Sequence, residues 1–110
     1  MPVEAKQLGS GVAVITLSGR LTLGADTADL DAAVDSLLEK NEKKLVLDLT
    51  ALEYADSSGI GMLISCLTKV HKSGGELKVA GANPRLRRIF SMTGVASLLP
   101  MFDTLADATA

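Results

Sequence analysis

Two adjacent serines lie where an apolar run gives way to a helical pattern, and their hydroxyl groups are the first candidates for chemistry. The segment 48–61 reads Asp-Leu-Thr-Ala-Leu-Glu-Tyr-Ala-Asp-Ser-Ser-Gly-Ile-Gly. A helix start has free backbone N–H groups and a partial positive charge, so a serine there is exposed and can carry a phosphate without breaking the fold. We therefore single out Ser57, which directly follows Asp56, as the functional position.

A purely structural interpretation of the same junction stays open. Asp and Ser are preferred N-caps, and Gly59 and Gly61 can serve only to let the backbone approach a neighbour closely. Met62 lies off the main apolar stripe of the following helix and close to the serines. A methionine more often fills gaps in a core, but an exposed one beside a switch residue would suit a protein interface.

Other chemistries find little support in the sequence. A nucleophilic serine needs a base, and the only histidine, His71, is about 20 Å away along the predicted helix. Neither serine is centred in a Gly-x-Ser-x-Gly elbow, and no Gly-rich phosphate-binding loop follows the strand. Cys66 and His71 have no further ligand cluster nearby, which favours a packed cysteine and a surface histidine. We expect neither enzymatic activity nor a cofactor nor a metal.

The hydrophobic spacing predicts the elements that position the serines. Strands are expected at 3–8, 12–17, 44–49 and 76–80, with a short last one around 97–102, and Ser18-Gly19 is expected to end the second. A first helix follows N-cap residues within 24–27, a second covers 58–72, and a third runs from Asn83-Pro84 to Gly94. The order predicts one α/β domain over 1–110, a mixed four- or five-stranded, largely parallel sheet with three long helices.

Composition narrows the classes of partner. The chain has 110 residues, of which 47% are hydrophobic and 3% aromatic, so one aliphatic core is expected. A net charge of −2 and few aromatic rings argue against nucleic-acid binding. No signal peptide or membrane-spanning run is apparent, and the single cysteine cannot form an internal disulfide, so we expect a soluble cytoplasmic protein that does not bind a membrane.

Two further features concern surfaces. Arg85, Arg87 and Arg88 crowd the start of the third predicted helix, where positive charge opposes the helix dipole; they form either a solvated face or a surface for an acidic partner. Each apolar stripe is used by one helix packing on the sheet, so we expect a monomer.

The serine junction is followed in order by Lys-Ser-Gly-Gly-Glu-Leu-Lys-Val-Ala-Gly and by Asn-Pro-Arg-Leu-Arg-Arg-Ile-Phe-Ser-Met-Thr-Gly-Val. Together these blocks resemble a STAS domain of the anti-sigma factor antagonist family over nearly the whole chain. The resemblance implies a protein that binds an anti-sigma factor, itself a serine kinase, and thereby frees a sigma factor. The family's phosphorylated serine maps onto Ser57, and a phosphatase restores the active form.

The resemblance also assigns the neighbours of Ser57 and leaves an alternative open. Asp56 matches the family's acidic residue, Ser58 its small hydroxyl residue, and Gly59 and Gly61 its glycines. The partner-binding candidates are Asp56, Ser57, Ser58, Gly59 and Met62. Many members carry Asp where this chain has Thr22, so the chain departs from the family pattern here and the resemblance does not identify which kinase is recognised. The alternative is a non-phosphorylated STAS module that acts as a scaffold in a transporter or signalling complex.

Overall fold

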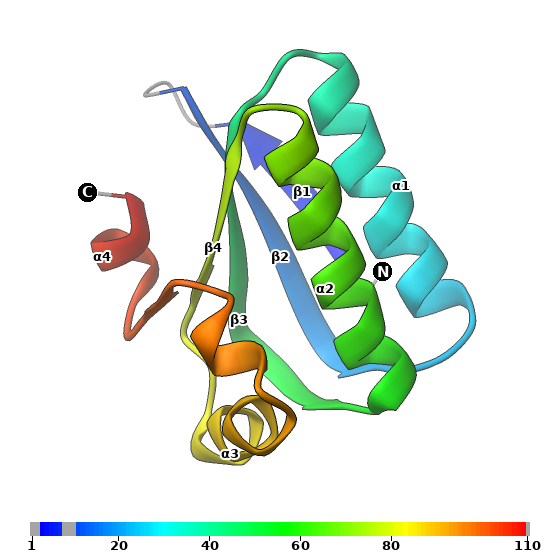
Figure 1. Cartoon of the computed structure of the whole chain (residues 1–110), viewed down its shortest axis with the longest axis vertical. Helices are drawn as coiled ribbons and strands as arrows, with labels where there is room; N and C mark the ends of the chain where they lie inside the picture. Colours follow the sequence, from blue (N-terminus) through cyan, green and yellow to red (C-terminus); the bar gives the residue numbers. More distant parts are fainter. Residues whose placement is uncertain (1–2, 8–10, 110) are drawn as a thin grey trace.

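A mixed five-stranded sheet forms the centre of the molecule in this computed structural model, whose description covers residues 3–7 and 11–109. The strand order is β1-β2-β3-β4-β5; β1 pairs antiparallel with β2, and every later pairing is parallel (Figure 1). The strands are β1 Val3–Gln7, β2 Val12–Leu21, β3 Lys44–Ala55, β4 Glu76–Ala80 and β5 Met101–Phe102. The helices are α1 Ala25–Glu39, α2 Ser57–Lys72, α3 Pro84–Thr93, the 3-10 turn η1 Val95–Ser97 and α4 Leu105–Thr109. The predicted single α/β domain is confirmed.

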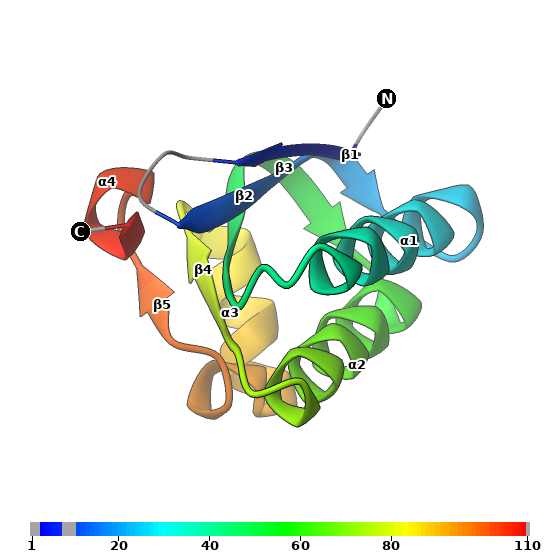
Figure 2. The ribbon, with the colours of Figure 1, turned by 90° about the horizontal axis from the view of Figure 1, so that it is seen from above.

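The two faces of the sheet are covered unequally. Successive side chains of a strand point to opposite faces. On β2, Ala13 and Ile15 join the main core with α1, α2 and α3, whereas Val12 and Val14 join a smaller cluster with α4. Figure 2 shows α1 and α2 lying side by side on one face of the sheet and the short α4 on the other side. The core is aliphatic, as the composition predicts, with Phe90 its one fully buried aromatic side chain among the described residues.

The two central strands are longer than the sequence analysis predicts. Ser18-Gly19 does not end β2, which continues to Leu21 through two shifts in its register with β3. Gly19 has a φ of 74°, so this glycine permits a bulge within the strand and does not terminate it. β3 likewise continues past residue 49 to Ala55, paired with the extension of β2.

Helix ends are predicted well where a side chain caps the backbone. Asn83 Oδ1 accepts from the backbone N–H of Leu86 at 2.8 Å, and Gly94 ends α3 with a φ of 80°, as expected. For α1 the N-cap is Gly24, which lies within the predicted range 24–27, but no side chain caps this helix. Asp26 and Thr27 instead lie in the first turn, where Thr27 Oγ1 donates to the Gly24 carbonyl at 3.0 Å.

The last part of the chain also differs from the expectation of one strand around 97–102. It forms η1, a two-residue β5 and then α4. The end of the first predicted strand at Leu8 lies outside the described residues. Neither difference touches the serine junction.

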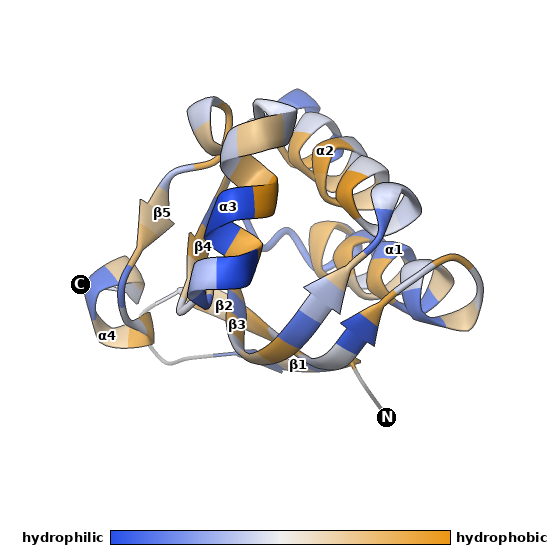
Figure 3. Ribbon diagram, turned by 90° about the horizontal axis from the view of Figure 1, so that it is seen from below, coloured by the Kyte–Doolittle hydropathy of each residue, from blue (hydrophilic) through white to orange (hydrophobic). Residues whose placement is uncertain are grey.

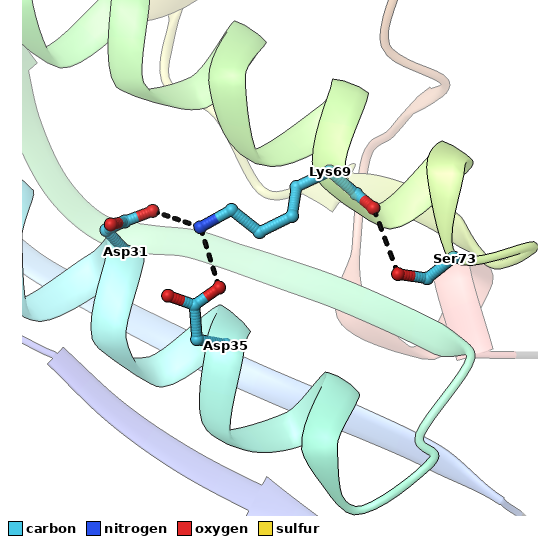
Figure 4. A network of polar contacts seen from close by, with 4 residues as sticks. All are labelled: Asp31, Asp35, Lys69 and Ser73. Carbon is cyan, nitrogen blue, oxygen red and sulfur yellow. Dashed lines mark hydrogen bonds and ion pairs between the residues drawn. The ribbon is translucent and has the colours of Figure 1, made fainter.

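An ion-pair network joins α1 to α2. Lys69 Nζ pairs with Asp35 Oδ1 at 2.7 Å and also with Asp31, one turn earlier on α1 (Figure 4). Burial lowers the pKa of Lys69, but hydrogen bonds to the two carboxylates outweigh this effect and leave the pKa raised. The network thus links α1 to α2, the helix that carries Ser57, in addition to the apolar core between them.

Candidate functional site

The serine junction lies at the end of the molecule where two parallel strands finish. Because β2 and β3 run in the same direction, their carboxyl ends meet at one edge of the sheet. The turn after β2, residues 22–24, therefore comes beside the start of α2, which follows β3 directly. Figure 3 views the molecule from this end, with α3 in front and the ends of β2 and β3 beside α2.

The Asp56 carboxylate forms hydrogen bonds to both the start of α2 and the turn after β2. Asp56 is the N-cap of α2, and its Oδ1 accepts from the N–H of Gly59 at 2.7 Å. Its Oδ2 accepts from the N–H of Leu23 at 3.2 Å, and its own N–H donates to the Leu21 carbonyl at 3.2 Å. The hydrogen bond from Gly59 is the main cause that lowers the pKa of Asp56, and the bond from Leu23 acts in the same direction. The N-cap interpretation of Asp56 is confirmed.

Ser57 is the first residue of α2 and is exposed. Its hydroxyl makes no hydrogen bond within the part of the chain that the structure describes, so a reagent in solvent can reach it. A phosphate on this oxygen would meet the positive end of the helix dipole and, on the other side, the negative charge of Asp56. Ser58 is half-buried and thus the less accessible of the two hydroxyls.

The two glycines of the junction have different roles. Gly59 is buried, and a Cβ built on it would overlap the carbonyl oxygen of Leu21, so α2 can approach the end of β2 this closely only with glycine. Around Gly61 a Cβ would find nothing within 4 Å. The close-approach interpretation is therefore confirmed for Gly59 and wrong for Gly61, whose surroundings offer no steric reason for glycine.

Two apolar side chains flank the serines. Met62 is half-buried and packs against the main core, which is closer to the gap-filling role than to an exposed interface residue; partner binding by Met62 stays a prediction. Leu23, which is not among the predicted site residues, is 77% exposed, and its backbone N–H donates to Asp56. A large apolar residue between Thr22 and Gly24, outside the predicted strand and helix, is the signal that could have indicated it.

The structure places the remaining candidates far from the serines. His71 is exposed near the far end of α2, about 20 Å from Ser57 by the helical rise. Cys66 is fully buried, and burial raises its pKa to about 11, which agrees with a packed thiol. No group of three or more His, Cys, Asp or Glu residues that could hold a metal occurs within 3–7 and 11–109. Over the same residues, no helix is long and apolar enough to span a membrane.

Comparison with known proteins identifies a family for this geometry. Residues 4–108 match the STAS domain family model. The anti-sigma F factor antagonist of Paenibacillus polymyxa is 30% identical over 100 residues, which cover 89% of this chain and 84% of the relative.

Solved structures agree with the sequence comparison. The crystal structure of an anti-sigma factor antagonist from Mycobacterium paratuberculosis superimposes with a TM-score of 0.81 at 30% identity, covering 97% of this chain and 89% of that one. SpoIIAA of Bacillus in its phosphorylated form gives a TM-score of 0.76 at 18% identity over 97% of this chain and 96% of its own. Its unphosphorylated form gives 0.75 at 17%, over 97% and 93%. The SpoIIAA fold is thus similar to this one in both forms.

Proposed function

This chain belongs to the STAS domain family of anti-sigma factor antagonists, and from that premise we propose that its unmodified form binds an anti-sigma factor serine kinase and that phosphorylation of Ser57 switches binding off. Release of a sigma factor follows from capture of the kinase. A phosphatase acting on phosphorylated Ser57 restores the active form. Because its proposed partner regulates transcription, we propose that the protein acts in the cytoplasm.

The observation that carries the proposal is the position of Ser57. It is an exposed hydroxyl on the first residue of α2, directly after the Asp56 carboxylate that caps the helix. A phosphate adds about −1.5 to −2 charge at neutral pH, which the helix dipole tolerates, so the fold is expected to survive. The effect of the modification must then be felt by the partner.

At the interface the added charge is unfavourable. A partner that covers Ser57 would bury a dianion beside Asp56, and two negative groups without a matching cation cost both desolvation and repulsion. Ser58 and Gly59 extend the proposed contact on one side of Ser57, Asp56 lies on the other, and Met62 follows one turn later. Thr22, where many members carry Asp, directly precedes Leu23, whose N–H donates to Asp56, and so lies beside the proposed contact.

The first test measures modification. We would incubate the chain with an anti-sigma factor serine kinase encoded in the same genome and with ATP, and then determine the intact mass and map the phosphate. We expect one phosphate on Ser57, none on Ser57→Ala, and normal modification of the matched control Ser58→Ala. A phosphate on Ser58 alone would overturn the assignment. A chain that binds no such kinase and takes up no phosphate would favour the scaffold function.

The second test measures affinity by titration calorimetry. If the phosphate costs ~3 kcal/mol at the interface, affinity should fall ~100-fold, at ~1.4 kcal/mol per decade. Ser57→Asp has less charge and bulk and should weaken binding less than the phosphate. Ser65→Asp, at an exposed position farther along α2 and outside the proposed contact, is the control and should bind like the wild type. Equal affinity of unmodified, Ser57→Asp and phosphorylated protein would refute the switch.

A further inference from the structure

Helix α3 presents a mixed basic and apolar face that the core does not use. Leu86 and Phe90 are its buried residues, whereas Arg85, Arg88 and Met92 are exposed and recur at intervals of three and four residues, which places them on one face. Met92 is 79% exposed. Leu98, which follows the turn η1 packed on α3, is 53% exposed. We call Arg85, Arg88, Met92 and Leu98 the α3 surface.

The positive charge of this surface is not balanced by the protein itself. Arg87 is engaged, because its Nη2 pairs with Asp103 at 2.7 Å and its Nε donates to the Ala82 carbonyl at 3.0 Å. Arg85 and Arg88 form no ion pair with any residue in 3–7 or 11–109. Arg85 is the second residue of α3, in the first turn, where the dipole disfavours cations and no acidic residue compensates; Arg88 follows in the next turn. Positive charge at the start of α3 therefore does not stabilise the helix, although the net charge of the whole chain is −2.

The α3 surface lies at the same end of the molecule as Ser57. The Asn83 side chain, which caps α3, also donates through Nδ2 to the Leu52 carbonyl at 3.1 Å, so the start of α3 is fixed to the strand that leads into Asp56 and Ser57. Figure 3 shows α3 and the start of α2 together at this end. A protein that covers Ser57 would therefore have the α3 surface within its reach.

We propose that the α3 surface binds an acidic, amphipathic segment of the anti-sigma factor partner. Carboxylates of that segment pair with Arg85 and Arg88, and an apolar side chain packs on Met92 and Leu98. The inference rests on the proposed function and deepens it: α3 recognises the partner, while Ser57 controls release. Exposed charges of this kind mainly steer encounter, whereas apolar anchors mainly slow dissociation.

The charge half of the proposal is tested with the double variant Arg85→Glu/Arg88→Glu. Its control is Lys6→Glu/Lys72→Glu, which makes the same change in net charge at exposed positions of β1 and of the far end of α2. With the wild-type chain's kinase partner immobilised, we expect the association rate of the α3 variant to fall about tenfold at ~0.15 M salt, with a smaller fall at high salt. The control should change it less than twofold.

Unfolding measurements separate this effect from damage to the fold. A glutamate at position 85, in the first turn of α3, complements the helix dipole, and position 88 is exposed, so Arg85→Glu/Arg88→Glu should melt at the same temperature as the wild type or higher. Lower affinity together with equal or greater stability is expected only if the arginines serve a partner. Unchanged association of a variant that is folded would overturn the α3 surface and leave the Ser57 switch standing.

The apolar half is tested with Met92→Ser/Leu98→Ser, which should raise the dissociation rate about tenfold and leave the association rate nearly unchanged. Leu105→Ser, on α4 and thus on the other face of the sheet, is the control. An unchanged dissociation rate would contradict the role of the two apolar side chains.

A final experiment tests the α3 surface without the kinase. Chain labelled with 15N would be titrated with a synthetic helical peptide of glutamates that carries leucines on one face, and separately with a single-stranded DNA oligonucleotide. We expect peptide-induced shifts at the four residues of the α3 surface and none at Lys6 or Lys72. Absence of these shifts, or equal binding of the oligonucleotide, would overturn the inference even if no kinase has been found.

Discussion

At the scale of single residues, Leu23 is an exposed apolar side chain in the turn that lies beside the start of α2 and Ser57. Its backbone is held by Asp56, so a large apolar group is presented at a fixed position beside the switch. We predict that Leu23→Ser lowers affinity for the anti-sigma factor kinase about tenfold, because burying this side chain in an interface contributes about 1.5 kcal/mol or more. Titration calorimetry gives the affinity, and the urea midpoint should stay unchanged, since the residue is 77% exposed. Wild-type affinity of the variant would show that the partner does not contact this turn.

The lowered pKa of Asp56 makes a second prediction at this scale. A carboxylate whose pKa is lowered on folding stabilises the protein at pH values above the ordinary carboxyl pKa of 3.8. This contribution to stability is lost as the pH falls through the lowered pKa. Asp56→Asn keeps an oxygen to accept from Gly59 but cannot ionise. It should be less stable than the wild type at neutral pH and should lose less stability between about pH 5 and about pH 2. Urea unfolding across this range is the measurement, and parallel curves for the two proteins would contradict it.

At the scale of elements, Gly59 and Gly61 form a matched pair on one helix turn. Gly59→Ala must push α2 away from the Leu21 carbonyl and should destabilise the fold by about 1–3 kcal/mol. Gly61→Ala meets nothing within 4 Å and should stabilise the exposed helix by up to about 1 kcal/mol. Chemical unfolding of the two single variants gives opposite signs; the same sign in both would mean that α2 does not dock on β2 as described.

The elements also show what a sequence can predict. Where a local signal has one meaning, as in Asn83 before Pro84 or in the apolar stripe of α2, the prediction agrees with the structure. Gly19 has two meanings, strand end or bulge, and only its pairing with β3 decides between them. The exposure of Leu23 is not predictable from its neighbours in the sequence, because it depends on how the turn meets α2. Apolar spacing along a single strand or helix carries no information about that contact. The serine junction was found because a helix start is defined by neighbouring residues alone.

At the scale of the whole molecule, the remaining question is whether free chains associate. The apolar residues of α1, α2 and α3 are largely consumed in one core, and α4 covers a smaller cluster on the opposite face. Of the large hydrophobic side chains that the structure describes, those left exposed are Leu23, Met92 and Leu98. The surface area of three side chains falls well short of the roughly 800 Å² that each partner buries in a stable interface.

We therefore predict that the unmodified chain is monomeric at micromolar concentration and stays so when Ser57 is phosphorylated, because the phosphate adds charge at an exposed helix start and uncovers no apolar surface. Light scattering of the two forms should give the same mass, near 11.4 kDa. Leu23→Ser serves as the control, since it removes one of the exposed apolar groups. A stable dimer that Leu23→Ser dissolves would mean that the surface assigned to the kinase pairs two copies of this chain, and that phosphorylation of Ser57 acts by separating them.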